Sequence, residues 1–270
     1  QSALMAVAAF AGSIAGGLLP PLCATLIGAN LEQPAPYRYP LLLAACVMLP
    51  AILALRATPR ESPVVADVPG TVAPGATAQL TIPSAVLAAI VMMGVVRLLQ
   101  VTALASVSNF FNVYLDRGLD ISTAQIGTIT AFGRLLAAPA ALATAGLSRR
   151  FGSVGVVTWS TLMSALAMLP LAIVPHWSAA GISLVMVVGF SSIRYASSLV
   201  YFLELVPPRR RATVAGVTEM AAGLSFTLVA LLGGYLIAWY SYTLLFGLAA
   251  VLTVLGALVF WAYFRRLQPA

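Results

Sequence analysis

The sequence predicts an all-α fold, a polytopic bundle of transmembrane helices, from its composition and the length of its apolar runs. The 270 residues are 61% hydrophobic and 8% charged, whereas soluble domains carry about 25% charged residues. A soluble core of this size cannot bury so much apolar surface, so the remainder must face lipid. Runs of roughly 20 apolar residues cross a bilayer core of about 30 Å as helices. Transmembrane strands are excluded because the runs are too long and do not alternate with a period of two.

Eight apolar runs qualify as spans or nearly so. The second is short, and the third is long enough that we expect it to tilt or to extend beyond the lipid. Inside lipid, only helices satisfy their own backbone hydrogen bonds across such runs. Prolines within the runs, among them Pro170, are expected to kink their helices. The predicted spans are residues 2–28, 39–55, 84–115, 122–147, 153–174, 178–205, 212–238 and 242–264.

The gaps between the spans predict the orientation. Nine arginines follow the second, fourth, sixth and eighth spans, whereas the opposite gaps hold only Arg38 and Arg117 beside three acidic residues. Because loops rich in Lys and Arg stay in the cytoplasm, we expect this side and the C-terminus to be cytoplasmic. All basic residues are arginine, which we interpret as the codon usage of a GC-rich bacterium, so the expected location is the bacterial cytoplasmic (inner) membrane. The nine are Arg56, Arg60, Arg149, Arg150, Arg209, Arg210, Arg211, Arg265 and Arg266.

One gap differs from the others and divides the chain. Residues 57–83 are rich in Pro, Ala, Val and Thr, with few charges and no periodicity, as is typical of a flexible linker. It lies on the predicted cytoplasmic side, with two spans in residues 1–56 and six in residues 84–270. The remaining gaps hold only about 3–10 residues, so neighbouring helices are expected to be antiparallel.

Three stretches of the sequence resemble a known transporter family. FFNVYLDRGLDISTAQIGTITAFGRLLAAPAAL (Phe110–Leu142), AGLSRRFGS (Ala145–Ser153) and ELVPPRRRATVAGVTEMAAGLSFTLVALLGGYL (Glu204–Leu236) are similar to helices and loops of the major facilitator superfamily. The resemblance covers essentially the whole chain. It implies that residues 1–56 are the last two helices of the N-terminal half and residues 84–270 a complete C-terminal six-helix half. It also implies that the family's first four helices precede this sequence.

The second stretch resembles the family's cytoplasmic loop signature, commonly G-x-L-x-D-R-x-G-R-R. Its matching residues are Gly146, Arg149, Arg150 and Gly152. Arg149 stands at the position that is acidic in the signature. The resemblance therefore implies the loop but leaves any gating ion pair there without its acidic member.

Four ionisable residues lie deep within predicted spans, where charge is costly and usually functional. Arg97 is about 13 residues, or roughly 20 Å, into its span, and Arg134 lies at a similar depth. Arg194 and Glu219 lie about 11 and 7 residues from the cytoplasmic ends of theirs. The resemblance makes these spans the family's helices seven, eight, ten and eleven, which face the central cavity. The spans matching helices six, nine and twelve hold no deep charge.

Polar stripes follow helical spacing on two of these spans. Such stripes suit a water-filled cavity, although interhelical hydrogen bonding would produce the same pattern. The stripes comprise Arg97, Gln100, Ser108 and Asn112 on the third span and Ser191, Arg194, Ser197, Ser198 and Tyr201 on the sixth.

Glu219 lies on a face of small residues that permits close helix approach. One interpretation is a structural ion pair with Arg194. The other is a protonatable site that couples transport to protons. The sequence leaves both open.

The leading functional hypothesis is a secondary transporter that moves a small solute by alternating access. Three deep arginines oppose one deep glutamate, which favours an anionic or polar substrate. One alternative is a non-transporting sensor or assembly factor on the same fold. Another is a lipid-modifying membrane enzyme, which is disfavoured because His176 is the sole histidine and no G-x-S-x-G or H-E-x-x-H pattern occurs. No catalytic residue, metal site or cofactor is expected. The arginines lie in gaps between apolar runs rather than on one solvated face, so no nucleic-acid partner is expected either.

Overall fold

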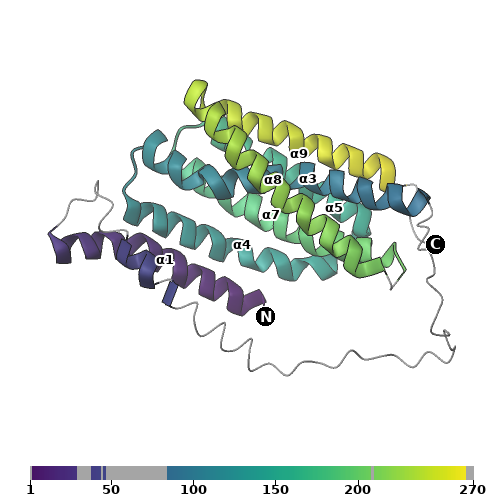
Figure 1. Ribbon diagram of the computed structural model, residues 1–270, viewed down its shortest axis with the longest axis horizontal. Coiled ribbons are helices and arrows are strands. Elements are labelled where there is room, and N and C mark those ends of the chain that lie inside the picture. Colours follow the sequence, from purple (N-terminus) through teal and green to yellow (C-terminus); the bar gives the residue numbers. More distant parts are fainter. Residues whose placement is uncertain (1, 29–37, 44, 47–83, 208–209, 266–270) are drawn as a thin grey trace, which may run out of the picture. The chain divides into compact units, whose positions relative to one another are not determined.

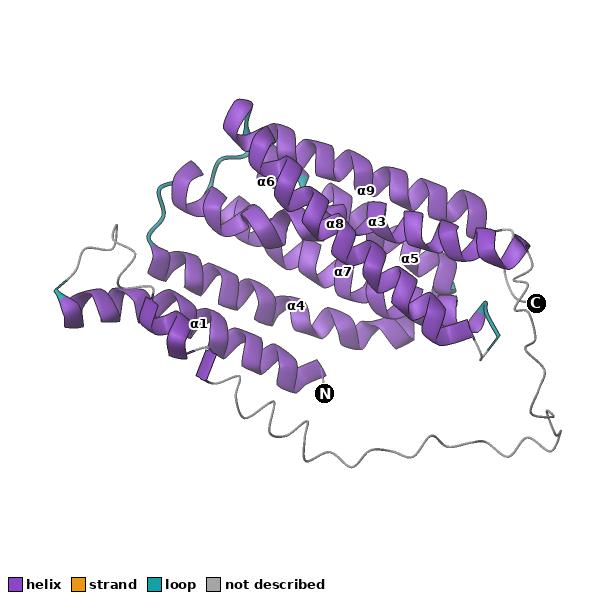
Figure 2. Cartoon of the chain, in the orientation of Figure 1, coloured by secondary structure: helices purple, strands orange, loops and turns teal. Residues whose placement is uncertain are grey.

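The computed structural model describes residues 2–28, 38–43, 45–46, 84–207 and 210–265, and helix is the only regular structure in these ranges (Figure 2). The chain forms two units, one of residues 1–18 and 88–270 and the other of residues 19–87. The predicted linker, residues 57–83, lies outside the described residues.

The first predicted span forms α1 (Ser2–Ile27), which contains Pro20 and Pro21. It ends at Gly28, whose φ of 67° is in the left-handed region that glycine adopts without strain. Of the second predicted span, the described residues are 39–43 and 45–46, and they are helical.

The remaining predicted spans match helices within a few residues. Two differences have local causes. The fourth span continues past its predicted end, because Gly152 with φ 72° is the first residue to break the helix. The fifth divides into two helices just before Pro170, which lies in the first turn of the second. The helices are α3 (Ser84–Val113), a π-helical turn η1 (Tyr114–Gly118), α4 (Thr123–Phe151), α5 (Ser153–Leu166), α6 (Leu169–Ile173), α7 (Trp177–Glu204), α8 (Arg211–Trp239) and α9 (Tyr242–Phe264).

Five described stretches are helical, long and apolar enough to cross a membrane. α4 is not among them. In α1 only a shorter apolar stretch, Ile14–Ile27, is recognised. The structure therefore confirms a polytopic helical membrane protein, and five of its eight predicted spans meet this test. The five are Leu87–Gly118, Ser153–Ile173, Trp177–Glu204, Arg211–Trp239 and Tyr242–Phe264.

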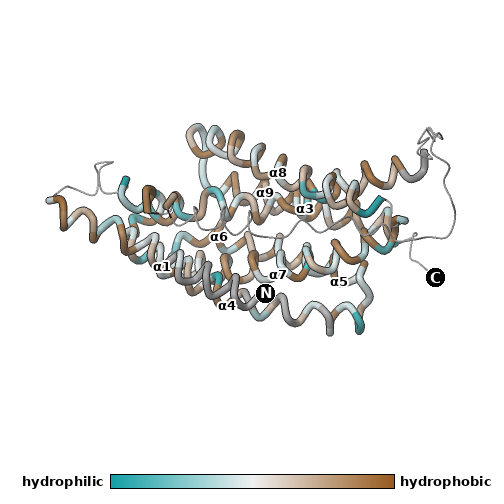
Figure 3. Tube along the Cα trace, turned by 60° about the horizontal axis from the view of Figure 1, so that its bottom comes forward, coloured by the Kyte–Doolittle hydropathy of each residue, from teal (hydrophilic) through white to brown (hydrophobic). Residues whose placement is uncertain are grey.

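Helices α3 to α9 pack as one bundle (Figure 1), in which α7 contacts α4, α5 and α8, and α9 contacts α5, α6 and α8. Two hydrogen bonds tie α3 to its neighbours. The Asn109 amide donates to the Phe226 carbonyl of α8 at 3.1 Å, and the Ala103 N–H donates to the Thr253 hydroxyl of α9 at 3.1 Å. Apolar residues recur along the helices (Figure 3), as expected where one face contacts the core and another contacts lipid.

Aromatic clusters hold the two ends of the bundle. Near η1, the Tyr114 ring lies 5.2 Å from the Tyr242 ring and 5.5 Å from the Phe246 ring, between centroids. At the other end, Tyr201 of α7 packs edge-on against Phe264 of α9 at 5.8 Å. Such ring pairs add about 0.5–1.5 kcal/mol beyond the burial of their area. They fix the ends of the helices that carry the charged residues.

Candidate functional site

A charged cluster lies where α3, α7 and α8 meet. Arg97 Nη2 of α3 is 3.7 Å from Glu219 Oε1 of α8, and the Arg97 guanidinium carbon is 4.9 Å from the ring centroid of Tyr195 of α7. The Arg97 side chain is 7% exposed and the Glu219 side chain 55% exposed. The cluster thus combines a buried cation with a carboxylate on an open surface of the described bundle.

The ion pair considered between Glu219 and Arg194 was wrong. The sequence left this pair open beside a coupling role, but the structure pairs Glu219 with Arg97. The helical rotation of 100° per residue explains the difference. It turns Arg194 into the interior of the bundle, where its residue is 1% exposed, and turns its neighbour Tyr195 outward to the cluster. Sequence reasoning missed Tyr195, since a single aromatic residue on an apolar helix gives no signal of its own.

Arg194 is a buried guanidinium without a counter-charge among the described residues. Its Nε and Nη1 atoms have no hydrogen-bond partner there. Its charged neighbour is Arg97, which has the same sign. An uncompensated buried charge costs several kcal/mol. An anion or a hydrogen-bond acceptor placed near Arg194 would therefore stabilise this conformation.

The polar stripe of α3 divides between two environments. Gln100 is buried against α9, where a Cβ added to Gly256 would lie 2.9 Å from the Gln100 backbone nitrogen. Its amide has no hydrogen-bond partner among the described atoms. Ser108 and Asn112 are exposed instead, and the Asn112 side-chain oxygen accepts a hydrogen bond from Thr130 of α4 at 3.3 Å. The outer part of the stripe is therefore accessible and the Gln100 position is not.

Arg134 of α4 lies beside the exposed part of this stripe. Its side chain is on the surface of the described bundle, where it shares a small cleft with Asn112, Ser108 and Thr130. The structure therefore brings Arg134 and Asn112 together, as a polar group separate from the Arg97–Glu219 cluster.

The polar stripe of α7 forms hydrogen bonds within the bundle. Ser197 shares one with Ser148 of α4 at 3.1 Å, and the Tyr201 hydroxyl donates to the Phe264 carbonyl of α9 at 3.3 Å. Ser191 shares a longer one with Ser164 of α5 at 3.4 Å. In the described conformation Ser191, Ser197 and Tyr201 join α7 to neighbouring helices, whereas the Nε and Nη1 atoms of Arg194, in the same stripe, have no partner among the described residues.

The residues that match the family's loop signature lie mostly in a helix rather than in a loop. Gly146, Arg149 and Arg150 lie in the last turns of α4, and only Gly152 is non-helical. Both arginines are exposed, and their charge suits the negative end of a helix dipole. His176 caps the start of α7, where its ring nitrogen accepts a hydrogen bond from the Ser178 N–H at 3.2 Å.

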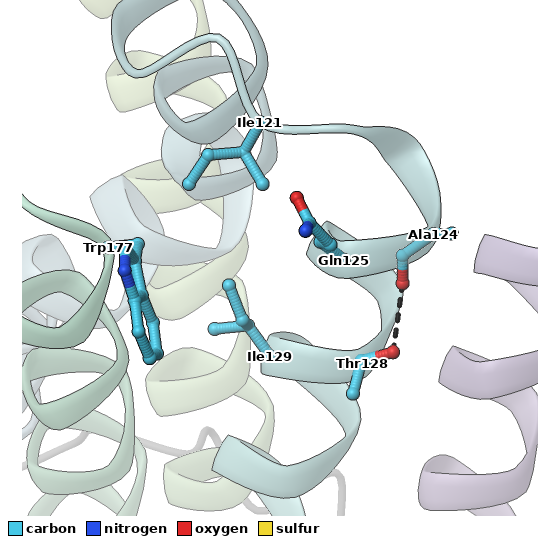
Figure 4. A pocket seen from close by; sticks show the side chains of 6 residues that line it. All are labelled: Ile121, Ala124, Gln125, Thr128, Ile129 and Trp177. Atoms are coloured by element: carbon cyan, nitrogen blue, oxygen red, sulfur yellow. Dashed lines mark hydrogen bonds between the residues drawn. The ribbon is translucent and has the colours of Figure 1, made fainter.

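A pocket of about 410 Å³ lies between the start of α4 and the start of α7 (Figure 4). The Thr128 hydroxyl on its wall donates to the Ala124 carbonyl at 2.9 Å, so it is already satisfied. Within the described residues, His, Cys, Asp and Glu nowhere gather as a metal site would require. The pocket carries no charge and is a weaker candidate than the cluster. Its lining residues are Ile121, Ala124, Gln125, Thr128, Ile129 and Trp177.

Comparisons with known proteins agree with this architecture. The sequence profile described as Major Facilitator Superfamily matches residues 93–270. The bundle is similar to a crystal structure of a mutant of the peptide transporter POT in complex with sulfate, with a TM-score of 0.53 and 20% identity. The match covers 66% of this chain and 38% of that transporter, which is a likeness of fold. No curated protein matches the sequence.

Proposed function

Because the chain belongs to the major facilitator superfamily, we propose that the full-length protein is a secondary transporter that moves a small solute by alternating access. The observation that carries the proposal is the half-exposed Glu219 beside the buried Arg97 in otherwise apolar helices. Charge at this depth is costly and is retained where it binds a solute or an ion. In such carriers, the binding site lies between halves that rock around it.

The substrate of this carrier is anionic or polar. Arg97, Arg134 and Arg194 oppose Glu219 alone among the deep residues described, so the bundle presents a positive potential to an incoming solute. The unpaired guanidinium of Arg194 adds a specific demand for an anion. We propose Arg97, Arg134 and Asn112 as substrate contacts, with Arg194 as a buried counter-charge. Gln100 and Tyr201 are both buried in the described conformation and are not among the proposed substrate contacts.

Protons are the proposed coupling ion, and Glu219 is their proposed site. A carboxylate that is half exposed in one conformation and paired with Arg97, which itself lies over the Tyr195 ring, can change its proton occupancy when the cavity opens to the other side. Alternation between a wet and a dry environment is what proton coupling requires of such a group.

Transport by the full-length protein in proteoliposomes tests the substrate class. A panel of small anions and cations is offered, and uptake of an anion is expected to fall in Arg97→Gln and Arg194→Gln. Arg265→Gln is the matched control, because Arg265 lies just past the end of α9 and stacks on Trp261 at 4.0 Å. Robust transport of a permanent cation that survives both cluster variants unchanged would contradict the proposal.

The proposed location is the bacterial inner membrane with the C-terminus in the cytoplasm. In a background without Cys23 and Cys46, a cysteine at Arg210 should react with impermeant reagents only from the cytoplasmic side. A cysteine at His176 should react only from the outside. Labelling of both positions from one side would overturn the orientation.

A further inference from the structure

An apolar groove runs along the surface of the bundle between the end of α4, α5 and α7. It encloses about 340 Å³. Trp159 and Phe151 form its outer rim and are 63% and 61% exposed. It shares no lining residue with the Arg97–Glu219 cluster, and nothing in the proposed transport function uses it. Its lining residues are Leu147, Phe151, Val156, Trp159, Ser160, Met163, Phe190 and Ile193.

The lining leaves almost nothing for a polar ligand to bind. The Ser160 hydroxyl, its one aliphatic alcohol, donates to the Val156 carbonyl at 2.6 Å. The other walls are aliphatic, thioether or aromatic. A hydrocarbon chain therefore matches this lining, and α5 is apolar enough to lie within the membrane, where acyl chains are at high concentration.

A cation lies at one end of the groove. Arg150 precedes the groove residue Phe151 in the last turn of α4, whereas Arg149, two residues from both Leu147 and Phe151, lies on the opposite face of that helix. The Arg150 guanidinium carbon is 5.4 Å from the Phe151 ring centroid, so its charge sits at the rim. Neither arginine has an ion-pair partner in the described part of the chain, and no acidic residue lines the groove.

We propose that the groove binds an anionic glycerophospholipid of the cytoplasmic leaflet. One acyl chain lies between Trp159 and Phe190, and the phosphate contacts Arg150. Guanidinium groups bind phosphate oxygens with two parallel hydrogen bonds. A guanidinium without a neighbouring carboxylate favours a lipid with net negative charge over a zwitterion, whose amine would have no partner. Basic sites between helices at the cytoplasmic surface bind such headgroups.

Native mass spectrometry of the purified full-length protein in detergent tests the proposal. The protein is titrated with phosphatidylglycerol and with phosphatidylcholine of the same acyl chains. Phosphatidylglycerol should bind more tightly, and Arg150→Gln should weaken its binding by about fivefold. Arg150→Lys, which keeps the charge but not the two-pronged geometry, should lose less. Trp159→Ala should weaken both lipids.

The control is Arg265→Gln, which removes another arginine at the same end of the bundle without touching the groove. It should bind both lipids as the unmodified protein does. Equal affinity for the two lipids would overturn the proposal, as would an equal loss in the control. Retention of a second copy of the chain, with phosphatidylglycerol binding indifferent to Arg150, would show that a protein covers the groove instead.

Discussion

Two sets of polar side chains lie within the same bundle and differ in what they contact. The serines and Tyr201 of the α7 stripe are buried, and Ser197 and Tyr201 form hydrogen bonds with α4 and α9. The cluster of Arg97 and Glu219 leaves a carboxylate half exposed and one guanidinium nitrogen without a partner among the described residues. Both sets follow helical spacing in the sequence. The comparison teaches that spacing identifies polar stripes, whereas their partners decide whether a stripe joins helices or remains available for a ligand.

Charge separates the two sets as well. Hydroxyl groups satisfy one another across a helix interface at little cost, because a single acceptor suffices for each donor. A guanidinium carries five donors and a formal charge, so an apolar interface rarely satisfies it. Arg194 belongs to the α7 stripe by position but to the charged set by chemistry, since its Nε and Nη1 remain unpaired in the described structure.

Removing the Glu219 charge should have the largest effect. Glu219→Gln keeps the shape of the side chain but cannot release a proton. In proteoliposomes, the full-length variant should lose accumulation driven by a pH gradient down to the background level. It should retain substrate exchange, because the solute site itself is intact.

Glu204→Gln is the matched control, because Glu204 is an exposed carboxylate at the end of α7. It should accumulate substrate normally. Normal pH-driven accumulation by Glu219→Gln would eliminate the coupling role and leave Glu219 as a structural residue.

The second effect concerns stability and belongs to Arg194. Replacing a buried charged group by a well-packed apolar one stabilises proteins by about 1–4 kcal/mol in favourable cases. Arg194→Met should therefore raise the free energy of unfolding in detergent while it lowers anion transport. A drop in stability would mean that Arg194 has an anionic partner elsewhere in the full-length protein. The lower anion transport of the variant would then result from the loss of that ion pair.

Much of the fold was predictable from the sequence. The bounds of α9 were predicted without error, because aromatic and charged residues flank an uninterrupted apolar run. The break at Pro170 followed from its missing N–H. The extension of α4 through Arg149 and Arg150 was not predicted, since the end of an apolar run marks the membrane boundary rather than the end of a helix.

The candidate site was predictable in part. Its deep charges could be recognised one by one, because each interrupts an apolar span. Their pairing could not, because it depends on the rotation of α3, α7 and α8 about their own axes. That rotation directs Glu219 to Arg97 and buries Gln100 against Gly256, and packing between distant segments decides it.

A smaller effect is expected where the α7 stripe joins α9. Tyr201→Phe removes the hydrogen bond to the Phe264 carbonyl and keeps the ring packing. The free energy of unfolding should fall by about 0.5–1.5 kcal/mol. Substrate affinity should stay the same, and a binding isotherm checks this. A large change in affinity at unchanged stability would place Tyr201 in the solute path and blur the distinction between the two sets.

The smallest effect tests the pairing itself, through a double-mutant cycle on unfolding free energies in detergent. Arg97 and Glu219 are 3.7 Å apart, but water screens the carboxylate, whose side chain is 55% exposed. Exposed pairs contribute about 0.2–1 kcal/mol, so Arg97→Leu and Glu219→Leu should show a coupling energy in that range. The matched cycle of Arg194→Leu with Glu219→Leu should be additive, because no contact joins those side chains in the described structure. A larger coupling in the second cycle would restore Arg194 as the partner of Glu219. It would then follow that α8 turns relative to α7 in the membrane.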